Sequence, residues 1–111
     1  MRLILAVLMF VATMPAMAAV QPSSAQCAAQ AVTQAGKLLA FHSDNDDRAE
    51  VAGPAKPLPS IVNPANSKQR FDVLEVWGYI YKGQYRMRFE YYRTGDSCVL
   101  MGQEILEYAS L

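Results

Sequence analysis

The chain has 111 residues, with ten basic and ten acidic side chains and a formal net charge of zero. This balance excludes a strong general attraction to nucleic acid or to anionic lipid, so we expect no nucleic-acid partner. The length suits one small domain and no more.

The first 18 residues have the parts of a secretory signal peptide. Arg2 supplies the positive charge, residues 3–14 are almost all apolar, and an Ala-x-Ala ending closes at Ala18. We therefore predict a signal peptide over 1–18, cleaved after Ala18, and a single domain over 19–111. The apolar run is shorter than the roughly 20 residues of a membrane span, so the mature chain should have no transmembrane segment. The predicted location is periplasmic or secreted.

The cysteines, Cys27 and Cys98, are even in number, which in an oxidising compartment predicts one disulfide bond between them. Their spacing is not the Cys-x-x-Cys of redox-active pairs, so a structural bridge is preferred. A disulfide between Cys27 and Cys98 closes a loop of about 70 residues, which stabilises a small domain by about 4 kcal/mol in the chain-entropy account.

Residues 23–42 have the periodicity of a helix, with Ser23 or Ser24 as the N-cap. The apolar stripe contains mostly alanine, which allows close approach to a partner layer. Its members are Cys27, Ala28, Ala31, Val32, Ala35, Leu38 and Leu39.

Residues 43–70 predict a Pro-rich loop, because proline disfavours both a long helix and a central strand. The prolines are Pro54, Pro57, Pro59 and Pro64. Three apolar residues, Leu58, Ile61 and Val62, would let part of this loop cover one face of the domain, and whether it does so stays open.

Residues 71–108 predict three antiparallel strands, with turns at Lys82–Gly83 and at residues 94–97. The expected fold class is α+β: an N-terminal helix packed on a three-stranded antiparallel meander and linked to it by the disulfide. The turn at Lys82–Gly83 pairs Ile80 with Tyr85, and it places alternate residues of the first two strands on one face of the sheet. That face comprises Leu74, Val76, Gly78, Ile80, Tyr85, Met87, Phe89 and Tyr91.

The predicted disulfide selects the register of the last strand, because Cys98 must point toward the helix that carries Cys27. With Arg93 opposite Cys98, strict alternation also turns Leu100, Gly102, Glu104 and Leu106 toward the helix. Gly78 and Gly102 would then leave room for the alanine-rich helix.

The opposite face combines aromatic and basic side chains, a composition found in binding hot spots. Its candidate contact residues are Trp77, Tyr79, Arg86, Arg88 and Tyr92. The predicted cross-strand pairs Trp77–Arg88 and Tyr79–Arg86 would stack guanidinium groups on aromatic rings. A homodimer through this face or through an unpaired edge strand is an alternative.

These patterns indicate a small exported binding or adaptor protein without catalytic activity. Its expected partner is another envelope or secreted protein, or a glycan fragment. One alternative is a cell-envelope hydrolase using Glu75 and Glu90 as paired carboxylates. Another is an inhibitor of a secreted hydrolase, with the Pro-rich loop entering the target.

No catalytic residue, metal site or cofactor is predicted. The acidic run Asp44–Glu50 has Arg48 and Ala49 where a calcium loop of the EF-hand type needs a ligand and a glycine. His42 is the only histidine, and no Gly-x-Ser-x-Gly nucleophile motif accompanies it.

Overall fold

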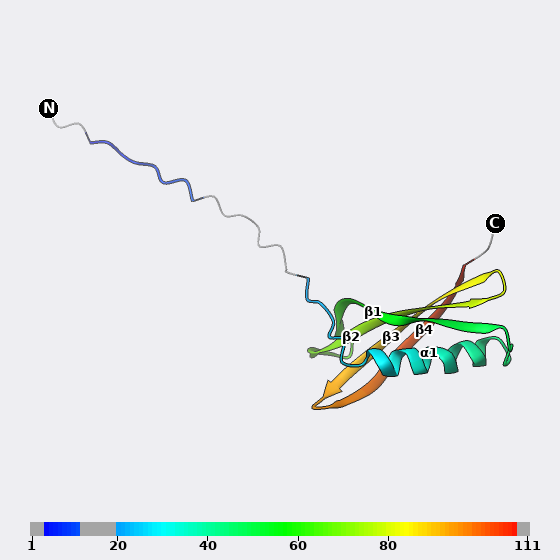
Figure 1. Cartoon of the computed structure of the whole chain (residues 1–111). Helices are drawn as coiled ribbons and strands as arrows, with labels where there is room; N and C mark the ends of the chain where they lie inside the picture. The colour runs from blue at the N-terminus through cyan, green and yellow to red at the C-terminus, as the bar shows by residue number, and fades with distance from the viewer. Residues whose placement is uncertain (1–3, 12–19, 109–111) are drawn as a thin grey trace.

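The computed structural model describes residues 4–11 and 20–108. One helix, α1 (Ala28–His42), precedes four strands: β1 (Ala49–Asn63), β2 (Asn66–Ile80), β3 (Gly83–Thr94) and β4 (Ser97–Tyr108). The strands form one antiparallel sheet in the order β1-β2-β3-β4, and α1 packs along one side of it (Figure 1). The α+β class is confirmed, with four strands where the sequence predicted three.

Residues 4–11 form an extended segment without helix or strand, and the predicted cleavage site after Ala18 lies outside the described residues. Among the helices of the described ranges, none has the length and apolar character needed to cross a membrane.

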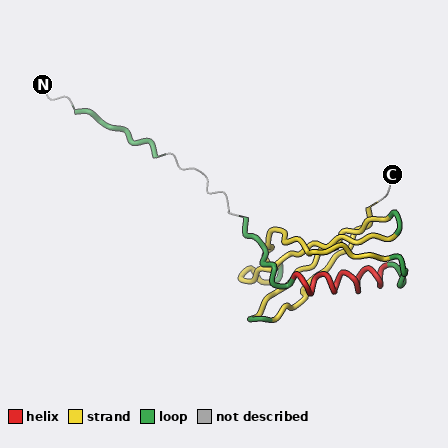
Figure 2. Tube along the Cα trace, in the orientation of Figure 1, coloured by secondary structure: helices red, strands yellow, loops and turns green. Residues whose placement is uncertain are grey.

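The prediction of a loop over residues 43–70 is wrong, because residues 49–63 form β1 at the edge of the sheet (Figure 2). An edge strand needs ladder hydrogen bonds on one side only, so prolines are tolerated where their missing N–H faces outward. The pairing of β1 with β2 also shifts register after Ala52 and after Leu58. The Pro-rich segment therefore forms an edge strand of the sheet.

The helix begins at Ala28, five residues later than predicted, with Cys27 as its N-cap. Ser23 does not cap it: its Oγ accepts a hydrogen bond of 2.7 Å from the backbone N–H of Val73. The backbone N–H of Ser24 donates to Asp72 Oδ1 at 2.9 Å. The two serines therefore join the segment before the helix to β2.

The core lies between α1 and the central strands, and the predicted disulfide is confirmed. Cys27 and Cys98 are bonded, with their Cα atoms 5.8 Å apart. Small side chains on α1 let the helix approach the larger apolar side chains of the sheet. The buried core residues are Cys27, Ala31, Ala35, Leu39, Ala55, Leu74, Val76, Ile80, Tyr85, Met87, Phe89 and Tyr91.

The β2–β3 hairpin has the predicted faces but not the predicted pairs. Ile80 pairs with Gly83, so the turn residues are Tyr81 and Lys82 and not Lys82 and Gly83. A Cβ on Gly83 would lie 3.1 Å from the Tyr85 ring, which explains why glycine is placed in the strand beside this buried tyrosine. The register moves by two residues, and a shift of two leaves every side chain on its own face.

A β-bulge at Met101 changes the faces of β4. Tyr91 pairs with Leu100, but the next residue, Glu90, pairs with Gly102, so Met101 is an extra residue. After the bulge, Ile105 pairs with Met87 and packs against the core. The predicted helix-facing positions of Gly102, Glu104 and Leu106 are therefore wrong, because all three lie on the other side of the sheet.

Candidate binding face

The side of the sheet opposite α1, here called the open face, carries the five candidate contact residues. The cross-strand pairs on it include Tyr79 with Gln84, Trp77 with Arg86, and Glu75 with Arg88. Gln84 in turn pairs with Tyr108 of β4. The paired residues that face this way include Glu50, Ala52, Lys56, Leu58, Ile61, Phe71, Val73, Glu75, Trp77, Tyr79, Gln84, Arg86, Arg88, Glu90, Tyr92, Val99, Gly102, Glu104, Leu106 and Tyr108.

Glu75 organises the centre of this face. It is only 8% exposed, and both of its carboxylate oxygens accept hydrogen bonds. Trp77 Nε1 donates to Oε1 at 3.1 Å, and Arg88 Nε donates to Oε2 at 2.9 Å. These bonds hold the indole and the guanidinium in place, so part of the entropy cost of binding is met in advance.

Arg86 lies next to two aromatic residues, Trp77 and Tyr108, which are not the pairing that was predicted. It pairs across the strands with Trp77, and its Nη1 donates to the Tyr108 hydroxyl at 2.9 Å. The guanidinium carbon lies 5.8 Å from the centre of the Tyr108 ring, and that ring lies 5.5 Å from the ring of Trp77. The predicted pairs Trp77–Arg88 and Tyr79–Arg86 are wrong, because the hairpin register differs by two residues.

Trp77, Tyr79 and Tyr108 form the aromatic cluster of the open face. Tyr108 was not predicted from the sequence to belong to this face. Strict alternation from Cys98 would turn it toward the helix, and only the bulge at Met101 brings it to the open face. The recurrent Tyr-rich composition of the strands was the one signal that pointed to it.

The open face ends in a hollow beside the β2–β3 turn. The hollow has a volume of about 360 Å³, and it is lined by Arg48, Glu50, Tyr79 and Tyr81. Arg48 lies 5.7 Å above the Tyr81 ring, and it forms hydrogen bonds of 3.0 and 2.7 Å to Asp46. These bonds, together with one from the Arg48 backbone, lower the pKa of the Asp46 carboxyl to about 2.

Tyr92 is on the open face but away from the aromatic cluster. It pairs with Val99, and it lies six residues along β3 from Arg86. At the rise of an extended strand this separation is about 20 Å. The structure therefore brings together Trp77, Tyr79, Arg86 and Arg88, and leaves Tyr92 apart.

The proposed carboxylate pair of Glu75 and Glu90 occupies diagonal positions, since Glu75 pairs with Arg88 and Glu90 pairs with Val73. Both carboxylate oxygens of Glu75 accept hydrogen bonds, from Trp77 and from Arg88, so this carboxylate holds the two side chains in place. In the described residues, no group of three or more His, Cys, Asp or Glu side chains is placed to hold a metal ion.

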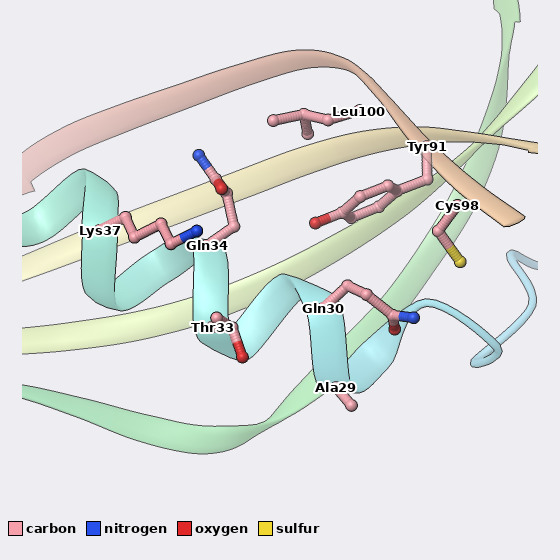
Figure 3. A pocket seen from close by; sticks show the side chains of 8 residues that line it. All are labelled: Ala29, Gln30, Thr33, Gln34, Lys37, Tyr91, Cys98 and Leu100. Carbon is pink, nitrogen blue, oxygen red and sulfur yellow. The ribbon is translucent and has the colours of Figure 1, made fainter.

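A cleft of about 500 Å³ lies on the other side of the sheet, between α1 and β4 (Figure 3). Polar side chains of α1, including Gln30, Gln34 and Lys37, form one wall, and Leu100 and Tyr91 form the other. Burial raises the pKa of the Tyr91 phenol. Gln34 Nε2 donates across the cleft to Gln103 Oε1 at 3.0 Å, so α1 contacts β4 there through polar groups.

Comparison with known proteins gave no match: no protein-family model matches the chain, and no curated protein or solved structure is significantly similar to it.

Proposed function

We propose that this chain is a small exported, non-catalytic binding or adaptor protein that contacts its partner through the open face. The observation that carries the proposal is the preorganised aromatic cluster on the side of the sheet that α1 does not cover. Tyr79 is 38% exposed, and Trp77 and Tyr108 lie ring to ring beside it. Rigid aromatic side chains gain contact area at low entropy cost, as in known binding hot spots.

The charges of the open face favour a partner of mixed character. Arg86 and Arg88 lie among Glu75, Glu90 and Glu104, so the face has no excess of positive charge. A charge-balanced aromatic surface suits the surface of another envelope or secreted protein, or the apolar side of a sugar ring. Export to the periplasm or the medium is part of this proposal, and the disulfide is compatible with it.

The proposal is tested with the full chain, purified after export and used as immobilised bait for an extract of envelope and secreted material. Tyr79→Ala and Trp77→Ala should each raise the Kd for the captured partner by about 30-fold or more, as expected for hot-spot residues. Phe41→Ala is the matched control, because Phe41 is an exposed aromatic residue on α1, away from the open face. It should leave the Kd unchanged.

Retention of the partner by both open-face variants would contradict the proposal. Circular dichroism and intact mass should accompany the assay, so that loss of binding is not confused with loss of the fold or the disulfide. Release of sugar products from envelope glycan that disappears in Glu75→Gln and Glu90→Gln would favour the hydrolase alternative.

A further inference from the structure

The outer edge of β4 differs from the outer edge of β1. Both strands are edges of the sheet, and an edge strand offers unpaired backbone N–H and C=O groups to another strand. Edge β1 is protected by three prolines, by Lys56 and by register shifts. Edge β4 has neither proline nor lysine over Ser97–Tyr108.

The apolar side chains of β4 are exposed on both sides of the sheet. Val99 and Leu106 are 42% and 44% exposed on the open face, and Leu100 is 36% exposed on the helix side. Ile105, also on the helix side, is half-buried. Within the described residues, no strand lies on the outer side of β4. A long edge strand with exposed apolar side chains and without proline or lysine is a template for strand addition.

We propose that β4 pairs antiparallel with β4 of a second copy, giving one continuous eight-stranded sheet with its two-fold axis at Gln103. Because of the bulge, helix-side residues of one copy meet helix-side residues of the other along the whole strand, and open-face residues meet open-face residues. Before Met101 the even-numbered residues face the helix, and after it the odd-numbered ones do. With Gln103 opposite Gln103, Leu100 meets Ile105 on the helix side and Val99 meets Leu106 on the open face. Each contact occurs twice, by symmetry.

Neighbouring registers that keep the faces aligned are worse. Moving the axis to Gly102 sets Val99 opposite Glu104, and moving it to Glu104 sets two carboxylates opposite each other. In the register centred on Gln103, Glu107 lies opposite Cys98 and Glu104 lies opposite Gly102. Only this register pairs apolar with apolar side chains on both faces.

One contact in this dimer is unfavourable. Glu104 would approach Glu90 of the second copy, because Glu90 lies over Gly102. Arg86, whose Nη2 lies 3.9 Å from Glu104 Oε1 within each copy, offsets this repulsion. The cleft between α1 and β4 leaves room on the helix side for the incoming strand, since α1 lines it with the small Ala29 and with polar side chains such as Gln30 and Lys37.

The oligomeric state of the full exported chain tests the proposal by sedimentation equilibrium. The wild type should be dimeric, and the double variant Val99→Lys/Leu106→Lys should raise the dimer Kd on the order of 100-fold, because two lysines then face each other at each pair. Val62→Lys is the matched control, since Val62 is 43% exposed on edge β1. A monomeric wild type, or an equal loss of dimer with Val62→Lys, would overturn the proposal.

Cross-linking tests the register independently of any destabilising change. The Cα atoms of directly opposite residues lie about 5.5 Å apart, within the range that a disulfide spans. Gln103→Cys should therefore give a covalent dimer under mild oxidation. Leu106→Cys, whose thiols would lie about 20 Å apart in the dimer and opposite Val99 of the second copy, should not. Equal cross-linking of the two variants, with Cys27–Cys98 intact by peptide mapping, would refute the register.

Discussion

Replacing Gly78 by alanine probes the contact between α1 and the sheet. A Cβ at this position would lie 2.8 Å from Leu39 Cδ2 and 2.9 Å from Met87 Cε. Both neighbours are fully buried, so neither can move into solvent. Overpacking of this kind costs about 1–3 kcal/mol, and removing a strand glycine returns part of it. We expect Gly78→Ala to lower the free energy of unfolding by about 1–2 kcal/mol and Tm by about 4–16 °C.

The matched control is Gly102→Ala. Gly102 faces away from the helix only because β4 has the bulge, so this variant also tests whether the bulge is present. Its Cβ would meet Glu90 Oε2 at 2.7 Å, the end of a half-exposed side chain that can rotate away, so stability should change by less than about 0.5 kcal/mol. Both variants are compared in urea, with Trp77 fluorescence and circular dichroism as probes. A Gly78→Ala protein as stable as the wild type would refute the packing argument. An equal loss in Gly102→Ala would place that glycine under the helix and refute the bulge.

Two further predictions concern the disulfide and the buried phenols. The double variant Cys27→Ser/Cys98→Ser should lose about 4 kcal/mol of unfolding free energy in urea at neutral pH, and a loss below about 1 kcal/mol would contradict the cross-link's contribution. Burial raises the pKa of Tyr91, and burial together with Glu107 raises that of Tyr85, so the folded state holds these protons longer than the unfolded chain. Their stabilisation is complete below about pH 10 and falls as the pH rises above it. Urea titrations from neutral to strongly alkaline pH should show this fall, and the Tyr91→Phe variant should show less of it.

The residues that the alternation rule governs directly were predictable from the sequence. Leu74, Val76, Gly78 and Ile80 face the helix as expected, because a strand's period of two is visible in a run of eleven residues. The disulfide followed from an even number of cysteines behind a predicted export signal. The five candidate contact residues lie on one face for the same reason.

The features that were not predicted depend on which residues pair across the strands, and the alternation of polar and apolar residues does not fix that pairing. Proline lowers the strand preference of residues 49–63, but the position at a sheet edge outweighs it. A register shift of two residues leaves the alternation of polar and apolar residues unchanged, so the sequence could not show that Trp77 pairs with Arg86 and not with Arg88. The extra residue at Met101 reverses the faces of Gly102, Glu104 and Leu106, and with them the place of Tyr108.

The bulge also determines how related sequences should be aligned. Cys98 and Ile105 both reach the helix side only because one additional residue separates them. A homologue that lacked this residue would have to give up either the disulfide or the buried isoleucine. The interval between the second cysteine and the following buried aliphatic residue is therefore a stronger marker of common descent than the spacing of the two cysteines, since loops elsewhere in the chain can lengthen freely.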